Sequence, residues 1–145
     1  MSKLGSFLRG VVAAILGAFL GGLVNMGLIV VGAKLLPPPA GVDVNDVASI
    51  DAHIGEYSVA QLLSPFLAHA LGTLIGAFAA SLVAGSQRAR LRAALVVGVL
   101  FQVGGIMAVS MIPSAPLWFD ALDLVVAYLP MALLGHRLAL RLRGA

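Results

Sequence analysis

The chain contains no cysteine and unusually few charged residues. The absence of cysteine excludes disulfides, thiolate catalysis and cysteine-ligated metal sites. Charged residues make up only 10% of the 145 residues, whereas a typical soluble domain carries about 25%. Hydrophobic residues account for 61%, and a soluble protein of this length has too little interior to bury so much apolar surface. The composition therefore predicts an integral membrane protein.

The motifs that mark common enzymes and binding proteins are also missing. The sequence has no P-loop, no GxSxG, and no dinucleotide-binding GxGxxG after a strand. The net charge is +3, but the basic residues do not interleave with aromatic residues as in a nucleic-acid-binding patch. HxxxH and ExxH pairs are absent as well. We therefore assign no catalytic residue, and we predict no metal, no cofactor and no nucleic-acid partner.

Four apolar runs are long enough to cross a bilayer, which requires about 20 helical residues. They cover residues 8–36, 62–84, 93–112 and 117–140. Pro130 lies within the last run and predicts a kink there. The segment 37–60 is the only long polar stretch, and we expect in it a short amphipathic helix that starts after Asn45 and ends at Gly55. The prediction is one domain of the all-α class, an integral membrane four-helix bundle.

The placement of charge predicts the orientation of this bundle. The basic residues, with the exception of Lys34, flank the N-terminus, the basic loop expected at 85–92, and the C-terminus. They are Lys3, Arg9, Arg88, Arg90, Arg92, Arg137, Arg141 and Arg143. The acidic residues lie in segment 37–60 or near helix ends beside it. By the positive-inside rule, both termini are expected in the cytoplasm and segment 37–60 in the periplasm.

Small residues recur at helical spacing in three of the four runs. Four-residue spacing places them on one helix face, and such faces allow membrane helices to approach closely. They are Gly17 and Gly21 in the first run, Ala68, Gly72, Gly76 and Ala80 in the second, and Gly98 and Gly105 in the third. We predict that these residues form helix-packing faces.

Each of the four runs carries one polar residue at a comparable depth. His69 and Asp123 come out roughly 6–12 Å from the outer boundary, and Asn25 and Gln102 about 13–17 Å, at 1.5 Å of rise per residue. An ionisable group in the hydrocarbon region costs at least about 2.5–3.5 kcal/mol, so His69 and Asp123 are natural partners. The simpler interpretation is a structural pair, and the alternative is a proton- or cation-binding site. The sequence leaves open whether the two side chains touch.

Two further ionisable residues have ordinary explanations. Asp120 lies in the first turn of the last run, where a carboxylate complements the helix dipole, and Trp118 beside it suits an interfacial anchor. His136 lies next to Arg137 near the C-terminus, and we expect it at the interface. Neither residue predicts a functional site.

Several segments resemble an uncharacterised family of small four-span bacterial inner-membrane proteins. They are Gly41-Val42-Asp43-Val44, Phe66 to Thr73, Pro116 to Phe119 with Leu122-Asp123-Leu124, and Tyr128 to Ala132. The resemblance covers nearly the whole chain. It implies a bacterial source and a multi-pass location in the inner membrane, and it implies no activity.

Three classes of function remain compatible with the sequence. The leading hypothesis is a helper or scaffold subunit that packs against other membrane proteins through its glycine faces. The first alternative is a small oligomeric proton or cation transporter or channel that uses His69 and Asp123. The second is a lipid- or quinone-linked membrane enzyme with His69 and Asp123 as a base and its orienting group. The expected partners are membrane lipids, and either a second copy of the chain or another membrane protein.

Overall fold

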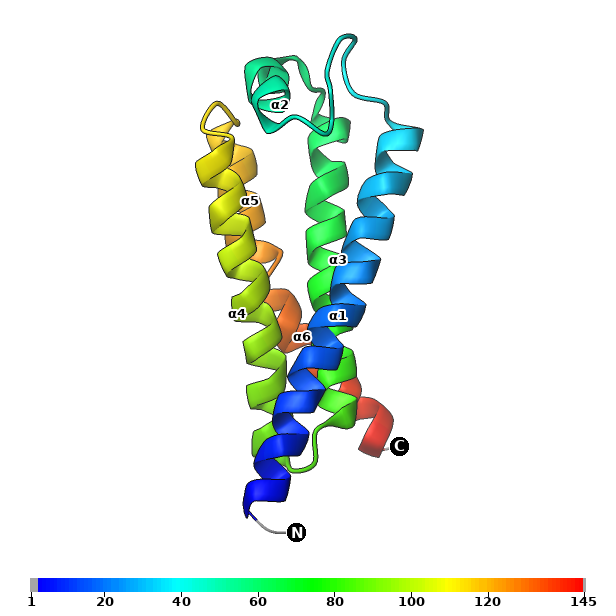
Figure 1. The fold of residues 1–145 in the computed structure, drawn as a ribbon. Coiled ribbons are helices and arrows are strands. Elements are labelled where there is room, and N and C mark those ends of the chain that lie inside the picture. The colour runs from blue at the N-terminus through cyan, green and yellow to red at the C-terminus, as the bar shows by residue number, and fades with distance from the viewer. Residues whose placement is uncertain (1–2, 145) are drawn as a thin grey trace.

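The computed structural model describes residues 3–144, which form helices and connecting turns without any strand. The elements are α1 (Lys3–Leu35), α2 (Val47–His53), the 3₁₀ turn η1 (Ile54–Glu56), α3 (Val59–Val83), α4 (Gln87–Met111), α5 (Leu117–Val126) and α6 (Leu129–Gly144). Helices α1, α3, α4 and the consecutive pair α5–α6 form a bundle (Figure 1). Each of these four units is long and apolar enough to cross a membrane.

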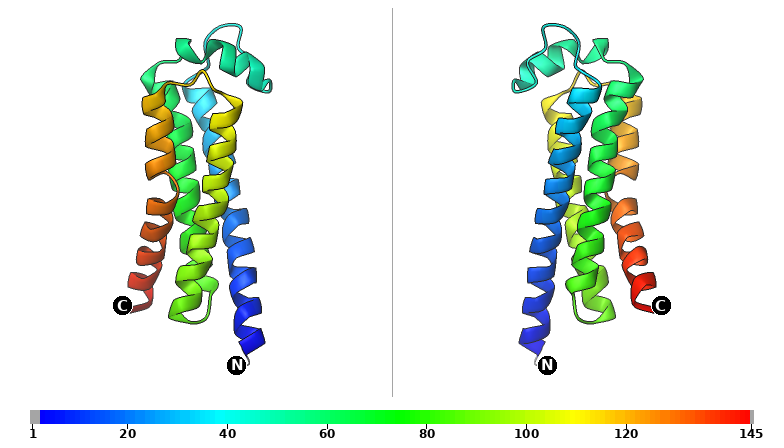
Figure 2. Two further views of the ribbon diagram at one scale, coloured as in Figure 1. Left: turned by 90° about the vertical axis from the view of Figure 1, so that its left-hand side faces the viewer. Right: turned by 90° about the vertical axis from the view of Figure 1, so that its right-hand side faces the viewer.

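Helix α3 is the central element of the bundle. It packs against α1, α4, α5 and α6, and Figure 2 shows the other long helices running beside it. Both ends of the chain lie at one end of the bundle together with the α3–α4 turn, and we call this the terminal end. The α1–α3 connection with α2 and η1 lies at the opposite end (Figure 1), which we call the loop end.

Glycines allow α1 and α3 to touch through their backbones. A Cβ at Gly76 would lie 2.6 Å from the Gly17 carbonyl oxygen, and a Cβ at Gly21 would lie 2.6 Å from the Gly72 carbonyl oxygen. Ala80 continues this contact, because its Cβ would lie 2.7 Å from a Cβ at Gly17. These residues are buried between the two helices. The packing faces predicted on the first two runs therefore pack against each other.

The third run uses its small residues against the last helix. A Cβ at Gly98 would lie 2.7 Å from the Ala132 Cβ, and one at Gly105 would overlap the ring of Tyr128. Gly135 of α6, which the sequence analysis did not single out, makes an equally close approach: a Cβ there would lie 2.9 Å from the Phe78 backbone nitrogen. Small residues thus set the spacing of every long helix around α3.

The last run is broken into two helices, which corrects the prediction of one kinked helix over 117–140. Helix α5 ends at Val126, Ala127 and Tyr128 form a turn, and α6 restarts at Leu129. Pro130 explains the break, since it cannot donate a backbone bond to the Val126 carbonyl and its ring crowds that group. Near the start of α6, where a helix has unpaired N–H groups in any case, proline is well tolerated.

The third helix begins earlier than the apolar run that predicted the third span. The expected loop at 85–92 is largely helical, because Ser86 caps α4 by accepting a bond from the Ala89 backbone N–H at 3.3 Å. Arginine is a good helix former, so the polar sequence after Ser86 does not stop the helix. The apolar run at 93–112 marks only where the hydropathy rises, seven residues after the Ser86 cap.

Two other helix starts were signalled by capping residues. Helix α3 begins after Ser58, which forms a complete capping box with Gln61, so the helix starts before the apolar run at 62–84. Pro65 consequently lies inside α3. The amphipathic helix in segment 37–60 exists, but Asp46 rather than Asn45 caps it, by accepting from Ala48 N–H at 3.0 Å. It gives way to η1 before Gly55.

The glycine contact between α1 and α3 predicts opposite outcomes for two substitutions. We expect Gly76→Ala to lower the stability by about 1–3 kcal/mol, because the new methyl group meets backbone atoms. We expect Gly22→Ala to be neutral or stabilising by up to about 1 kcal/mol, because a Cβ there meets nothing within 4 Å. Thermal unfolding in detergent measures both, and equal effects at the two positions would contradict this packing.

Candidate ligand site at the loop end

His69 of α3 and Asp123 of α5 form an ion pair or charge-assisted hydrogen bond inside the bundle. The His69 Nδ1 atom lies 2.9 Å from Asp123 Oδ1. The side chain of Asp123 is 5% exposed and that of His69 is 21% exposed, so the histidine is the more accessible of the two. The two residues come from helices that are far apart in sequence and adjacent in space.

Tyr128 completes this cluster, and the sequence analysis did not include it. Its hydroxyl donates to Asp123 Oδ2 at 2.5 Å and lies 3.1 Å from His69 Nδ1. Its ring stacks on the His69 ring with centroids 5.9 Å apart. The α5–α6 break places Tyr128 at this level, and Gly105 leaves room for the ring. The only sequence signals were a tyrosine shortly after the buried aspartate and a glycine on a facing helix.

These contacts determine which nitrogen of His69 is free. An ionised carboxylate can only accept hydrogen bonds, so with Asp123 as a carboxylate the bond between its Oδ1 and His69 requires Nδ1 to be the protonated nitrogen. Within residues 3–144, Nε2 of His69 has no hydrogen-bond partner. This nitrogen is not buried, so it is accessible from outside the cluster. A neutral His69 therefore offers Nε2 as an acceptor, and a protonated His69 offers it as a donor.

A cavity of about 880 Å³ lies next to this cluster. His69, Asp123 and Asp120 lie on its wall, and helices α1, α3, α4 and α5 all contribute to it. Most of the wall is apolar and includes Met26, Ile29, Val30, Leu62, Ile112 and Phe119. Apolar cavities of this size with a few convergent polar groups are typical of small-molecule sites.

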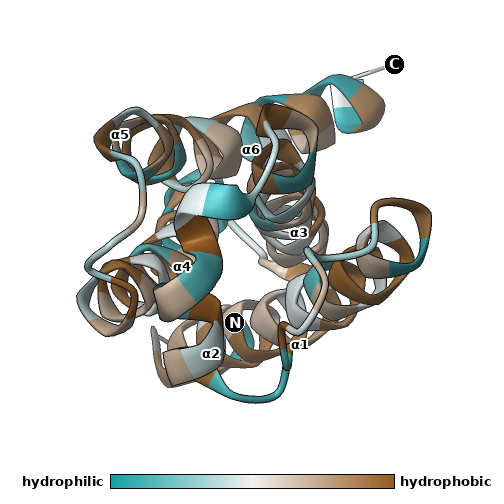
Figure 3. Ribbon diagram, turned by 90° about the horizontal axis from the view of Figure 1, so that it is seen from above, coloured by the Kyte–Doolittle hydropathy of each residue, from teal (hydrophilic) through white to brown (hydrophobic). Residues whose placement is uncertain are grey.

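The connection between α1 and α3 covers the loop end of the cavity. Figure 3, viewed from this end, shows α2 lying across the bundle. Ile50 and Ile54 belong to the cavity wall, and Asp51 accepts a bond from the Ser114 backbone N–H at 2.9 Å, which ties α2 to the α4–α5 turn. Tyr57 also lines the cavity. Burial raises the pKa of its hydroxyl above the ordinary value, so Tyr57 is neutral and can donate at pH 7.

The other two residues of the predicted polar cluster do not join His69 and Asp123. Gln102 donates from Nε2 to the Leu124 carbonyl oxygen at 3.0 Å, and so links α4 to α5. Asn25 lies against Gly72, and its Oδ1 is the one buried side-chain oxygen or nitrogen without a hydrogen-bond partner in residues 3–144. The structure thus brings together two of the four predicted residues and adds Tyr128 to them.

A second buried polar contact lies near the terminal end. His136 of α6 is 9% exposed, and its Nδ1 lies 3.1 Å from the Ser81 hydroxyl of α3. Helix α6 therefore turns this residue toward α3 and away from the surroundings of the bundle. The interfacial depth expected for His136 stays a prediction. Between the two polar contacts the bundle is filled by apolar residues. Ala77, Val97 and Ala132 are all fully buried there.

Arginines from three helices satisfy the carbonyl groups at the end of α3. Arg9 donates from Nε to the Val83 oxygen at 2.8 Å, and Arg143 donates to the Leu82 oxygen. Arg90 donates to the oxygens of Ala84 and Gly85 at 3.4 and 3.1 Å. The last carbonyls of a helix lack partners within it and carry its negative dipole end. Three of the basic residues therefore also fasten the terminal end of the bundle.

The described part of the chain brings together no group of three or more histidine, aspartate or glutamate side chains that could hold a metal ion. Comparison with known proteins yields no relative either: no protein-family model, curated protein or solved structure matches the chain. The resemblance drawn from short segments is accordingly not supported by a family match, and the site has to be interpreted from its own geometry.

The hydrogen bonds around Asp123 predict a non-additive double-mutant cycle. Asp123→Asn and Tyr128→Phe should each destabilise the bundle, and their effects should be coupled by about 0.5–2 kcal/mol. The measurement is thermal or denaturant unfolding of the two single variants and the double variant in detergent. Asp120→Asn is the matched control, since Asp120 lines the same cavity without a hydrogen bond from its side chain. Strictly additive effects would contradict the cluster.

Proposed function

We propose that the chain is a multi-pass membrane protein whose loop-end cavity binds a small lipophilic molecule. The length and hydropathy of the four helical units support insertion into a bilayer. The concentration of arginines at the terminal end supports an orientation with both termini in the cytoplasm. In that orientation the cavity faces the periplasmic half of the membrane. The bacterial inner membrane is proposed from the resemblance alone.

The observation that carries the binding function is the position of His69 on the wall of the 880 Å³ cavity, with an Nε2 atom that has no hydrogen-bond partner in residues 3–144. A histidine whose other nitrogen is fixed by a carboxylate has a defined ring orientation and tautomer. Here Asp123 and Tyr128 fix it, which leaves Nε2 as the nitrogen that remains for a ligand in a mostly apolar cavity. Tyr57 and Asp120 add polar groups to the same wall, and a few polar groups in an apolar cavity can orient a ligand.

The chemistry of this position defines the ligand class. Neutral His69 would accept a hydrogen bond from a hydroxyl, and protonated His69 would donate one to a carbonyl. The apolar wall suits an isoprenoid, acyl or similar hydrocarbon body. We therefore propose a ligand with a hydroxyl or carbonyl head and a hydrocarbon body, a class that includes quinones and neutral lipids. Binding is the proposed activity, and chemical turnover is not part of the proposal.

The alternatives derived from the sequence are less well supported by this geometry. A transporter or channel would require a polar path, and the apolar layer around Ala77, Val97 and Ala132 separates the two buried polar contacts. A helper subunit was expected to dock through its glycine faces, and those faces contact other helices of the same chain. The helper function remains our second proposal because two glycines of α1, Gly22 and Gly27, are not packed against another helix of residues 3–144. A Cβ at either position would have no atom within 4 Å. A stoichiometric membrane partner that co-purifies in mild detergent would support it.

The absence of cysteine makes the proposed orientation directly testable. We expect Val44→Cys, in the exposed α1–α3 connection, to react with a membrane-impermeant maleimide on intact cells. We expect Gln87→Cys, in the exposed first turn of α4, to react only after the cells are permeabilised. The cysteine-free parent provides the background. The reverse pattern, or labelling of both positions on intact cells, would contradict the proposed topology.

Ligand binding is tested by purification from bacterial membranes in mild detergent, followed by mass spectrometry of what remains bound. We expect the wild type to retain a lipophilic compound with a hydroxyl or carbonyl head. His69→Gln should weaken its retention about tenfold, the equivalent of one lost hydrogen bond. His53→Gln is the control, because His53 lies at the loop end but does not line the cavity. Equal retention by the two variants, or an empty wild-type protein, would contradict the proposal.

A further inference from the structure

A second cavity lies between α1 and α4 at the terminal end, on the opposite side of the apolar layer from His69. Its volume is about 740 Å³. It exists because the facing positions there are small: Gly10 and Ala14 on α1, and Ala89 and Ala93 on α4. With so little side-chain volume at these positions, the two helices leave a groove between them.

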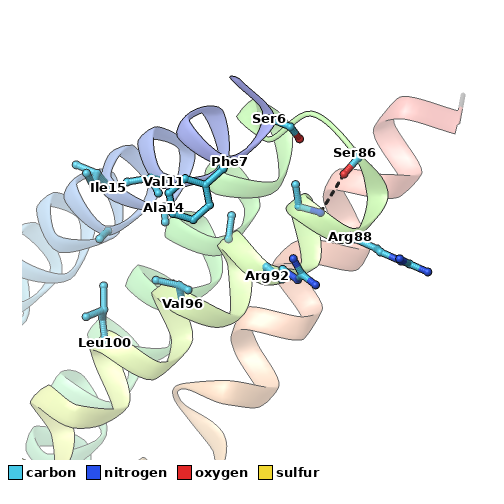
Figure 4. A pocket seen from close by; sticks show the side chains of 14 residues that line it. Ser6, Phe7, Val11, Ala14, Ile15, Ser86, Arg88, Arg92, Val96 and Leu100 are labelled. Carbon is cyan, nitrogen blue, oxygen red and sulfur yellow. Dashed lines mark hydrogen bonds between the residues drawn. The ribbon is translucent and has the colours of Figure 1, made fainter. Parts of the chain in front are cut away.

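The groove combines apolar walls with a basic rim. Figure 4 shows Phe7, Val11 and Ile15 coming from α1 and Val96 and Leu100 from α4, with the arginines on the first turns of α4. Arg88 and Arg92 line the groove four residues apart, so they lie on the same face of the helix. Ser6 and Ser86 add hydroxyl groups to the same rim. The groove therefore has apolar walls along its length and a basic, hydroxyl-bearing rim at one end.

Neither arginine of this rim is neutralised within residues 3–144. Arg9, Arg90 and Arg143 donate to carbonyl groups, whereas Arg88 and Arg92 make no hydrogen bond or ion pair with the described residues. The sequences of α1, α4 and α6 contain no acidic residue. The rim thus carries two exposed cations that have no complementary anion among residues 3–144.

We propose that this groove holds one acyl chain of an anionic phospholipid, with the phosphate group at Arg88 and Arg92. From Arg88 to Leu100, α4 rises about 18 Å, close to the half-thickness of a bilayer core, about 15 Å. The groove therefore runs from the headgroup level toward the bilayer centre. A second copy of the chain fits less well, because in the same orientation it would bring its own arginines to this basic end. This inference uses the membrane placement proposed above but not the ligand site at His69.

The proposal is tested with purified protein in mixed detergent micelles that contain equal amounts of phosphatidylglycerol and phosphatidylcholine with identical acyl chains. Native mass spectrometry then counts the lipids that remain bound. The wild type should retain phosphatidylglycerol about thirtyfold over phosphatidylcholine, since each of the two arginines near an anionic headgroup contributes on the order of 1 kcal/mol. Arg88→Gln with Arg92→Gln should bring the ratio close to one.

Two matched controls separate a specific site from surface charge and from groove shape. Arg137→Gln with Arg141→Gln removes the same charge from an exposed pair at the same spacing that does not line the groove, and it should leave the ratio unchanged. Gly10→Leu fills the groove at a position with no atom within 4 Å of a Cβ, and it should reduce retention of both lipids. Gly22→Leu, equally open but outside the groove, should not.

The outcomes are distinct from those that test the His69 site. If substitution of either arginine pair lowered the ratio of phosphatidylglycerol to phosphatidylcholine equally, the attraction would be general to the charged surface and the proposal would be overturned. Retention of both lipids in equal amounts by the wild type, displacement of the lipid by inorganic phosphate, or a homodimer in place of a bound lipid would overturn it as well. The thermal unfolding midpoint of each variant verifies that the bundle is intact. If cysteine labelling gave the reverse orientation, the membrane placement itself would fail.

Discussion

Burial of the Asp123 carboxylate is the constraint on which the loop end of this bundle depends. A carboxylate in an apolar interior is costly unless other groups of the protein neutralise or hydrogen-bond it. Here the partners come from two other elements, His69 of α3 and Tyr128 of the turn before α6. Each oxygen of Asp123 has one of them. The cluster therefore fixes the positions of three chain segments and, in doing so, fixes the ring of His69 against the cavity.

His69 and Tyr128 reach Asp123 because small residues let the helices pack closely where they cross and leave space beside them. Backbone contact at Gly17, Gly21, Gly72 and Gly76 holds α1 against α3. Gly105 leaves space for the Tyr128 ring. Where small residues face each other without touching, as at Gly10 and Ala89, the bundle leaves a groove instead. Small side chains thus account both for the close helix contacts at the centre and for the groove at the terminal end.

Much of this architecture could be predicted from the sequence because it depends on local patterns. Apolar runs predicted four helical units, four-residue spacing predicted which glycines pack, and the capping box at Ser58 marked the start of α3. Polar residues in apolar runs predicted that His69 and Asp123 need partners. The full break at Ala127 and Tyr128 was not predicted, because a proline in a helical pattern is compatible with either a kink or a new helix start.

The remaining features depend on three-dimensional packing, which a single sequence does not reveal. Tyr128 joins the cluster by a hydrogen bond to Asp123 from the turn before α6, and His136 is buried against Ser81 of α3. The arginines at the end of α3 were expected only to flank the spans, whereas three of them also cap its carbonyl groups. In each case the relevant partner is far away in sequence and has no motif of its own.

The most direct test of this account is the tautomer of His69, measured by solid-state NMR on protein with ¹⁵N-labelled histidine in lipid bilayers. His69→Gln identifies the signal among the three histidines of the chain. The account predicts that the neutral ring carries its proton on Nδ1 and that Asp123→Asn abolishes this preference. A neutral His69 protonated on Nε2 in the wild type would contradict both the cluster and the site built on it.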